Sequence, residues 1–358
     1  MSFSGGMDST GLLLHLLAKD YTVSCISYDY GQKHRIEIEK ASQNIKYLSD
    51  SGYSVEHKIV DLTSTIGIFS SALTDTGIEV PEGYYEQEQM KATVVPNRNA
   101  IFSSIIYGYA LSIHSIEGVP VKIALGVHSG DHAIYPDCRP EFYDALESAF
   151  KIGNWDSENI DFYLPYLEGD KESILRDAMK SIKKLNLDFD TVFANTITSY
   201  NPDEYGVSSG RSGSDVERIL AFDSIGKKDP IQYQEPWDVV LSNAKREALR
   251  YYVMKQNGTE RAFTGEYDKH FEKGNYYCAD CDIILFTSDS KFDSGCGWPA
   301  FSEEHESANI AQLEDTSHGM KRIEVRCSNC DSHLGHLFHE YTGPRYCINS
   351  ICLEFRGD

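Results

Sequence analysis

The chain has 358 residues, a formal net charge of −22, 41% hydrophobic residues and 25% charged residues. This length predicts two domains, and the composition is typical of a soluble globular protein without a membrane-spanning run. The acidic excess argues against a nucleic-acid partner, because affinity for phosphate backbones comes largely from Lys and Arg. The start, MSFSGGMDST, has no basic leader or cleavage site, so we expect a cytoplasmic location.

The first two thirds of the chain alternate β-branched runs with amphipathic stretches, the pattern of a parallel sheet covered by helices. We expect a doubly wound, Rossmann-like α/β domain. Only residues 1–3 precede a glycine loop, so either the first strand is a stub or the true start lies upstream. The expected strands are 22–28, 55–60 and 121–127, and the expected helices are 9–18, 36–48, 99–113, 140–150, 172–185 and 216–222.

Residues 199–214 are rich in Ser, Gly, Asn and Pro and predict a loop. A helix is expected from Pro236 to Lys255, followed by short strands, aromatic residues and paired cysteines. We place the domain boundary after residue 235. The two predicted domains are therefore residues 1–235 and a smaller, mainly β domain at residues 236–358.

All cysteines except Cys25 and Cys138 lie in the C-terminal third, which in a reducing compartment indicates metal ligation or redox catalysis. Two Cys-x-x-Cys pairs have the spacing of knuckle turns that hold a tetrahedral Zn²⁺. We expect a closed, structural zinc site; the alternative is four reduced cysteines buried as small hydrophobic residues. The four candidate ligands are Cys278, Cys281, Cys327 and Cys330.

Cys347, in the run RYCINS, is the predicted nucleophile. Arg345 lies two residues away and thus on the same face of a strand, and cationic neighbours favour the reactive thiolate. His333 and His336, in HLGHLF, either stabilise the thiolate and donate protons or are structural residues. We therefore expect a sulfur at position 347 that nearby cationic groups keep ionised.

The blocks GTERAFTGEY, CADC, LFTSDSKFDSGCGWPAF, SHGMKRIEVRCSNCDSHLGHLF and RYCINS resemble the B-type peptide-methionine (R)-S-oxide reductases over the C-terminal third. The resemblance implies that Cys347 attacks the sulfoxide sulfur of methionine-sulfoxide-containing proteins or peptides, while His333 or His336 protonates the departing oxygen. It also implies four further site residues: Arg345 and Asn349 for the thiolate and substrate, and Trp298 and Phe338 for the apolar wall around the S-methyl group.

By the same resemblance, Cys347 becomes a sulfenic acid, Cys296 condenses with it to a disulfide, and thioredoxin or another dithiol reductant restores both thiols. The alternative is that Cys296 is a spare thiol and reduction occurs at Cys347 itself. The segment HEYTGP is shorter than the corresponding loop of the family, and Cys352 stands in place of a serine, where we expect it only to pack. A competing interpretation makes this domain a zinc-held module that binds Met-containing partners without turnover.

The run SGGMDST, residues 4–10, stands at a strand-to-helix turn, where backbone N–H groups and the helix N-terminus favour a phosphate. Asp8 is a candidate for organising Mg²⁺, although a Gly-Gly pair is also found in plain tight turns. The order SGGxDS resembles the loop of ATP pyrophosphatases, of the adenine nucleotide alpha hydrolase type, which transfer AMP and release pyrophosphate. This resemblance implies an ATP site made of Ser4, Gly5, Gly6, Asp8 and Ser9.

Further blocks, DYGQKHRIEIEKA, VPNRNAIF, GVHSGDHAIYPDCRPEF and VERILAF, resemble 7-cyano-7-deazaguanine synthase over residues 1–235. The resemblance implies that ATP activates the carboxylate of 7-carboxy-7-deazaguanine, that ammonia forms the amide, and that a second activation forms the nitrile of the queuosine pathway. We expect Arg98, Asp137 and Arg139 near the substrate and Lys171 at phosphate, or else in ordinary surface or salt-bridge roles. A homodimer would fit this family.

Four positions depart from the synthase pattern, because that family carries zinc-binding cysteines there. Serine hydroxyls are poor zinc ligands, so we expect no metal in this domain. The domain is then a synthase with a rebuilt loop, an enzyme that activates another carboxylate, or a non-catalytic nucleotide-binding docking module. The four positions are Ser199, Ser209, Ser212 and Asp215.

Overall fold

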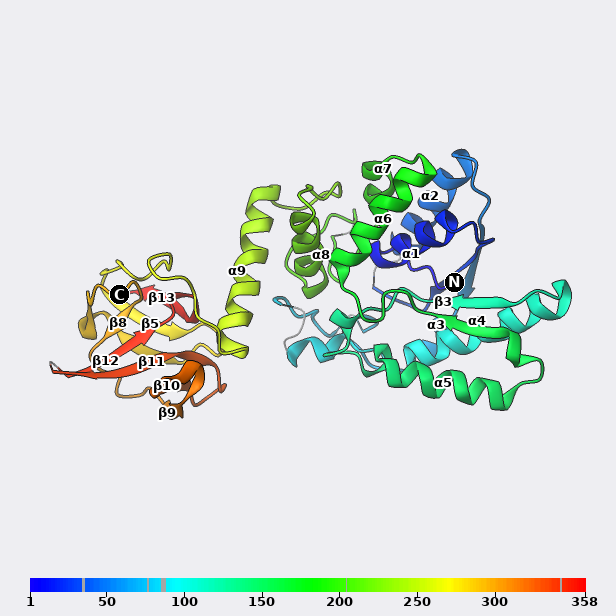
Figure 1. Ribbon diagram of the computed structural model, residues 1–358. Helices are drawn as coiled ribbons and strands as arrows, with labels where there is room; N and C mark the ends of the chain where they lie inside the picture. Colours follow the sequence, from blue (N-terminus) through cyan, green and yellow to red (C-terminus); the bar gives the residue numbers. More distant parts are fainter. Residues whose placement is uncertain (34–35, 76, 85–87, 204, 342) are drawn as a thin grey trace. The chain divides into compact units, whose positions relative to one another are not determined.

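The structure is a computed structural model of the whole chain, in which residues 1–33, 36–75, 77–84, 88–203, 205–341 and 343–358 are described (Figure 1). His34 and Arg35 of the DYGQKHRIEIEKA run, and Thr342 of HEYTGP, lie outside the described residues. The chain forms two compact units, Met1–Ala244 and Lys245–Asp358. None of the described helices is both long and apolar enough to cross a membrane.

The N-terminal unit is built on a parallel sheet in which β1 pairs with β2 and β3 pairs with β4. Residues 1–3 lie between the two pairs, because Ser2 forms a parallel bridge with Ile26 and its N–H donates to the Ala124 carbonyl at 3.1 Å. This short central segment leads directly into the glycine loop. The strand bounds are β1 Ser24–Asp29, β2 Glu56–Asp61, β3 Val121–Ala124 and β4 Ile160–Tyr163.

The predicted helices are present, with ends that agree within a few residues. The sequence did not predict α3, α7 or β4, since segments of four to six residues are too short to carry a periodic signal. The helix bounds are α1 Met7–Ala18, α2 Ile36–Asp50, α3 Thr63–Ile66, α4 Arg98–Glu117, α5 Pro140–Gly153, α6 Lys171–Leu185, α7 Phe189–Ala194, α8 Gly213–Ser224 and α9 Trp237–Lys255.

Helices cover both faces of the parallel sheet (Figure 1). Cys25 packs in one apolar cluster with side chains of α1 and α6, while the adjacent Ile26 packs in another with side chains of α4 and α5. Helices α1 and α6 approach closely because Gly11 has no Cβ in the path of Ile174. The prediction of a doubly wound α/β domain is therefore confirmed.

The C-terminal unit is mainly β, as predicted, and its strands pair in antiparallel fashion. One sheet has the order β7-β8-β12-β11-β10-β9 and another the order β13-β5-β6. Both contribute to one core, in which the Phe286 and Phe301 rings stack with their centroids 4.3 Å apart. The bounds are β5 Gly274–Cys278, β6 Ile284–Thr287, β7 Lys291–Phe292, β8 Ala300–Phe301, β9 Ile310–Asp315, β10 Arg322–Cys327, β11 His333–Glu340, β12 Gly343–Ile348 and β13 Leu353–Gly357.

The two compact units divide within α9, between residues 244 and 245, which is nine residues beyond the boundary predicted at 235/236. In its first turns Val240 and Ala244 pack on Val216 and Ile219 of α8, while its last turn contributes Met254 to the C-terminal core.

Short 3₁₀ helices complete the described secondary structure. Their bounds are Glu88–Thr93, Ser129–Asp131, Pro136–Cys138, Ser157–Asn159, Ser288–Ser290, Ser317–Gly319 and Ser350–Cys352.

Candidate functional sites

Cys347 lies on β12, and the strand register places His336 of β11 directly opposite it. Phe338 is paired in the same way with Arg345. Residues two apart on a strand share a face, so these four side chains form one patch, while the intervening Tyr346 and Leu337 point into the core. Four of the predicted site residues are thus brought together on one sheet face.

Cys296 completes this patch from the loop between β7 and β8. Its Sγ lies 3.6 Å from the Sγ of Cys347, and both thiols are half-buried. A disulfide requires about 2.05 Å between the sulfurs, so the two thiols are separate and reduced here. A small movement would be enough to join them.

The expectation of an ionised sulfur at position 347 is wrong for this reduced state. Burial raises the pKa of Cys347 to about 12, and the neighbouring Cys296 thiol adds to the shift. Arg345 opposes the shift only in part. Its guanidinium also donates to Glu340 Oε1 at 2.6 Å and lies over the Phe338 ring at 4.6 Å. The cation is therefore shared, and the thiol keeps its proton until a partner removes it.

The two predicted histidines have separate carboxylate partners. His333 Nδ1 lies 2.7 Å from Glu324 Oε1, and His336 Nε2 lies 2.9 Å from Asp315 Oδ2. Burial lowers the pKa of His333, although Glu324 opposes the shift. Each carboxylate fixes the orientation of its ring. Of the two, His336 is the residue directly opposite Cys347, which sequence spacing alone did not decide.

Glu260, in the GTERAF run, is a site residue that the sequence reasoning missed. Its buried carboxylate accepts hydrogen bonds from the backbone N–H groups of Ser350 and Ile351, the latter at 3.1 Å. Its carbonyl oxygen accepts the indole N–H of Trp298 at 3.1 Å, and its own N–H donates to Asn349 Oδ1 at 3.0 Å. One residue thus joins the segment after Cys347 to the segment after Cys296.

This arrangement also explains where Asn349 and Trp298 lie. Asn349 is buried, and its amide also donates to the Leu334 carbonyl at 3.0 Å, so it braces the turn after Cys347. Trp298 is half-buried beside the Cys296 loop, and its indole is fixed by Glu260.

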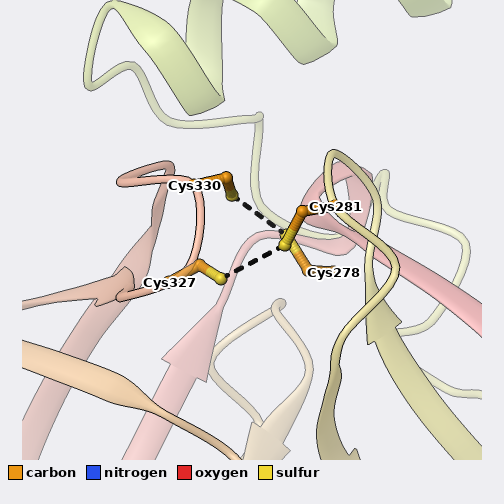
Figure 2. A group of neighbouring side chains, drawn as sticks. All are labelled: Cys278, Cys281, Cys327 and Cys330. Atoms are coloured by element: carbon orange, nitrogen blue, oxygen red, sulfur yellow. Dashed lines mark hydrogen bonds between the residues drawn. The ribbon is translucent and has the colours of Figure 1, made fainter.

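The four predicted zinc ligands come together at the end of the C-terminal unit, with all sulfurs within 4.8 Å of one another (Figure 2). The sulfurs of Cys278 and Cys330 are 3.7 Å apart, and those of Cys281 and Cys327 are 3.6 Å apart. A tetrahedral Zn²⁺ with Zn–S distances of about 2.3 Å separates its sulfurs by about 3.8 Å. The four thiols therefore fit a zinc ion.

The two cysteine pairs sit in matching turns. Asp282 follows the first pair and Asp331 the second, with φ of 62° and 56°, and each N–H donates back to the first cysteine of its pair. Aspartate tolerates this left-handed conformation better than most residues. Around the cluster, Lys255 Nζ lies 2.6 Å from Asp280 Oδ2 and 3.0 Å from Ser332 Oγ. The sequence pattern CxxCD, present twice, thus encodes the turn as well as the ligands.

In the N-terminal unit, the glycine loop lies between residues 1–3 and α1. Gly5 has φ of 84°, a left-handed conformation that favours glycine. Ser4 Oγ accepts the Gly6 N–H at 3.2 Å and lies 3.1 Å from Ser9 Oγ. The loop is thus held by its own serines with the first turn of α1 behind it, an arrangement that suits a phosphate.

A cluster of charged groups surrounds this loop. Lys171 Nζ, at the start of α6, lies 2.9 Å from Asp8 Oδ2, 2.9 Å from His128 Nε2 and 3.4 Å from Glu217 Oε2. Although burial opposes both shifts, Lys171 and His128 hold the pKa of Asp8 well below its usual range, and Asp8 and Glu217 raise the pKa of Lys171. Lys171 was predicted at a phosphate site, whereas His128 and Glu217 were not predicted as site residues.

A cavity of about 230 Å³ opens beside the glycine loop, where the central strands end. Its walls include Arg98, Glu37, and the rings of Tyr28 and Phe102, which stack 3.9 Å apart. Burial raises the pKa of Glu37 to about 7, although Arg98 opposes the shift. Ligands of open α/β sheets bind at the carboxyl ends of the strands, so this cavity is the candidate substrate site. Strand β3 is shorter than predicted because residues 125–127 line this cavity.

Asp137 and Arg139 lie apart from the cavity lining. The Asp137 carboxylate accepts the Asn99 N–H at 3.3 Å in the first turn of α4, and Arg139 donates to the His132 carbonyl at 2.8 Å. Both residues therefore brace the loops around the site. Their neighbour Cys138 does line the cavity.

Comparisons with known proteins match the two units separately. The family model described as "Queuosine biosynthesis protein QueC" matches residues 1–226, and the model described as "SelR domain" matches residues 247–357. A 7-cyano-7-deazaguanine synthase of Marinomonas sp. (strain MWYL1) is 39% identical over 232 residues, which cover 65% of this chain and 96% of that protein. The 7-cyano-7-deazaguanine synthase 1 of Colwellia psychrerythraea (strain 34H / ATCC BAA-681) is 42% identical over 233 residues, 65% of this chain and 96% of that protein.

Proposed function

Since the chain belongs to the 7-cyano-7-deazaguanine synthase family and ends in a SelR domain, we propose that it is an enzyme with two activities. The C-terminal unit reduces peptide-bound methionine (R)-S-oxide. The N-terminal unit uses ATP to activate a small carboxylate, with 7-carboxy-7-deazaguanine as the leading substrate. The pair of sulfurs at 3.6 Å, with His336 opposite, carries the first assignment.

The reductase reaction begins when the Cys347 sulfur attacks the sulfoxide sulfur of the substrate. Because the pKa of this thiol is raised to about 12, its proton must leave as the attack proceeds. His336, or His333 behind it, protonates the sulfoxide oxygen, which leaves the substrate sulfur as water while the new bond joins the sulfurs of Cys347 and methionine in a sulfonium. Water then attacks the Cys347 sulfur and gives up a proton, the sulfur–sulfur bond breaks, methionine departs, and Cys347 is left as a sulfenic acid.

Regeneration uses the second thiol. The Cys296 sulfur attacks the sulfenic sulfur of Cys347, which forms a disulfide and releases water. Thioredoxin or another dithiol then reduces the disulfide by exchange and is itself oxidised. Trp298 and Phe338 would form the apolar wall around the S-methyl group of the substrate.

The tetracysteine cluster would hold a structural Zn²⁺. Cys278, Cys281, Cys327 and Cys330 would hold the ion, which would tie the turn after β5 to the turn after β10, and both strands belong to the core that supports β12. The ion would supply folding free energy there, with four protein thiols as its ligands. The chemistry at Cys347 is therefore left to the side chains of the sheet face.

Substitution of the two thiols tests the reductase assignment. Cys347→Ser should abolish reduction of an (R)-sulfoxide peptide with either dithiothreitol or thioredoxin as donor. Cys296→Ser should keep most turnover with dithiothreitol and lose most turnover with thioredoxin. Cys352→Ser, a change at a buried thiol away from the pair, is the matched control. A wild-type protein that binds Met-containing peptides without any turnover would instead support the binding-module interpretation.

In the N-terminal unit, the glycine loop and Lys171 would bind the phosphates of ATP, and Asp8 would help hold its Mg²⁺. Attack of the substrate carboxylate on the α-phosphate forms an acyl adenylate and releases pyrophosphate. Ammonia displaces AMP to give the amide, and adenylation of the amide oxygen followed by loss of AMP gives the nitrile. Arg98, which lines the cavity, would pair with the substrate carboxylate.

Pyrophosphate release in the presence of ATP, ammonia and 7-carboxy-7-deazaguanine tests this assignment, with nitrile formation followed by mass spectrometry. Pyrophosphate release with a different carboxylate, but not with 7-carboxy-7-deazaguanine, would assign another substrate to the same reaction. Absence of release with every carboxylate tested, together with measurable ATP binding, would support the docking-module alternative.

A further inference from the structure

Four serines surround one buried carboxylate in the N-terminal unit. Asp215 Oδ2 accepts hydrogen bonds from Ser199 Oγ at 2.9 Å and Ser212 Oγ at 2.8 Å, and Ser209 Oγ lies 3.5 Å away. Asp215 Oδ1 accepts from Ser208 Oγ at 2.5 Å. We call these five residues the serine–aspartate knot. Ser199, Ser209, Ser212 and Asp215 stand where the synthases that this domain resembles carry cysteines, and Ser208 is an added member.

The knot closes a loop and caps a helix. Ser212 is the N-cap of α8: its hydroxyl accepts the Asp215 N–H at 3.3 Å, and its own N–H donates to the Asp215 carboxylate at 3.3 Å. Ser199 stands at the other end of the loop, on the far side of residues 200–211. One carboxylate thus ties both ends of the loop together through charge-assisted hydrogen bonds.

The donor set does not fit a zinc ion. Each serine that donates to Asp215 uses its only O–H proton, and the knot contains a single carboxylate. Neutral hydroxyls are weak ligands for Zn²⁺. Among the described residues, the close group of His, Cys, Asp or Glu that suits a metal is the tetracysteine cluster of the C-terminal unit. The loop is therefore held by hydrogen bonds in place of a metal.

The residues next to the knot form walls of the phosphate-binding region. Thr198 and Tyr200, on either side of Ser199, line a hollow together with Ser4, Asp8 and Lys171, and Ser214 lines it from the other end of the loop. In α8, two residues beyond Asp215, Glu217 lies 3.4 Å from Lys171 Nζ. The position of this carboxylate therefore depends on the first turn of α8, which the knot caps.

Arg218 shows how firmly this turn is held. Its buried guanidinium donates to both carboxylate oxygens of Asp229, at 2.5 and 2.9 Å, and to Thr196 and Thr198 at 2.8 and 3.0 Å. A bidentate pair of this kind fixes a direction as well as a distance. The knot, through Ser199, and the Arg218 guanidinium, through Thr196 and Thr198, thus attach α8 to the same segment, residues 196–199.

We propose that the serine–aspartate knot is a metal-free clamp that holds residues 198–200 against the first turn of α8 and positions Glu217 beside Lys171 at the nucleotide site. Asp215 is thus a positioning residue for nucleotide binding. The role of Asp215 in nucleotide binding rests on the proposed ATP site, whereas the proposal that the clamp holds its loop without a metal does not.

Metal analysis of the full-length protein gives the first test. The clamp predicts one zinc per chain, and none in a Cys278→Ser/Cys281→Ser variant. A second zinc that persists in this variant and is lost in Asp215→Ala would overturn the proposal.

ATP binding gives the second test, measured with a fluorescent ATP analogue. Asp215→Ala should weaken binding at least about tenfold, whereas Asp190→Ala, a change at an exposed carboxylate on α7, should not. Replacement of Ser199, Ser209, Ser212 and Asp215 by cysteine should add one zinc per chain and recover most of the affinity in its presence. Reductase turnover should be the same in Asp215→Ala, in Asp190→Ala and in the four-cysteine replacement, and it verifies that the C-terminal unit of each is folded. Wild-type affinity in Asp215→Ala would contradict the proposal.

A wild-type protein that binds no ATP would refute the ATP site and leave the clamp to be judged by limited proteolysis. In the presence of a chelator, the segment 200–214 should resist cleavage in the wild type and be cut in Asp215→Ala. Equal resistance in the two proteins would then contradict the clamp itself.

Discussion

Asp8 and Lys171 are 163 residues apart in the sequence, yet their carboxylate and ammonium groups lie 2.9 Å apart next to the glycine loop. The lysine is the first residue of α6 and is almost fully buried. Glu217 and His128 complete its surroundings, so a cation is held in place before any phosphate arrives. Such preorganisation suits the proposed nucleotide site.

Replacement of this lysine should therefore weaken nucleotide binding. In Lys171→Met the phosphates lose their cation and Asp8 and Glu217 lose their shared partner, so we expect at least about a tenfold loss of affinity for a fluorescent ATP analogue. Lys180→Met, a change at an exposed lysine of the same helix, is the control. Equal ATP affinity in the two variants would remove Lys171 from the site.

The reactivity of Cys347 should increase with pH well beyond the neutral range. Its pKa is raised to about 12, so the thiolate fraction grows as the pH rises from 7 to 10 without reaching a plateau. Because Cys296 raises and Arg345 lowers this pKa, Cys296→Ser should react faster with iodoacetamide at pH 8, and Arg345→Ala more slowly. Mass spectrometry identifies the alkylated residue. A plateau of the Cys347 rate near pH 6 would mean that the thiol is already ionised there.

Removal of the metal should unfold the C-terminal unit selectively. Structural zinc contributes about 10 to 16 kcal/mol of binding free energy in small domains. The C-terminal unit could not lose this much of its free energy of unfolding and remain folded. A chelator that strips zinc, or Cys281→Ser, should therefore abolish reductase turnover and near-UV circular dichroism of that unit, while ATP binding by the N-terminal unit persists. Full reductase turnover in protein shown to be metal-free would contradict a structural role for zinc.

Glu260 should matter for the disulfide between Cys296 and Cys347. Glu260→Ala leaves the buried N–H groups of Ser350 and Ile351 without their acceptor, which costs about 1 to 3 kcal/mol for each group, and frees the Trp298 segment. We expect a lower melting temperature and slower formation of the disulfide after one turnover with an (R)-sulfoxide. Glu260→Gln, which keeps one carbonyl acceptor, should recover part of both. A disulfide rate unchanged in Glu260→Ala would show that other contacts align the two segments.

Much of this protein could be predicted from local pattern. The alternation of strands and helices predicted the doubly wound domain, since elements that bury apolar side chains on both faces of a parallel sheet produce a periodic pattern of apolar residues in the sequence. The two Cys-x-x-Cys pairs identified the thiols that come together, because each knuckle turn is a local structure. Short elements such as α7 and β4 were missed, since they depend on packing more than on their own residues.

The charge states and partners of the site residues could not be predicted in this way. Arg345 near Cys347 suggested a thiolate, but burial and the neighbouring Cys296 thiol raise the pKa of Cys347 by more than Arg345 lowers it. Glu260, His128 and Glu217 had no local signal, because their partners are distant in the sequence. The serines around Asp215 looked like the loss of a metal site, and only their convergence on one carboxylate revealed a replacement. The sequence by itself determined which residue types and turns are present, whereas desolvation and contacts across the fold, which exist only after packing, decided what those residues do.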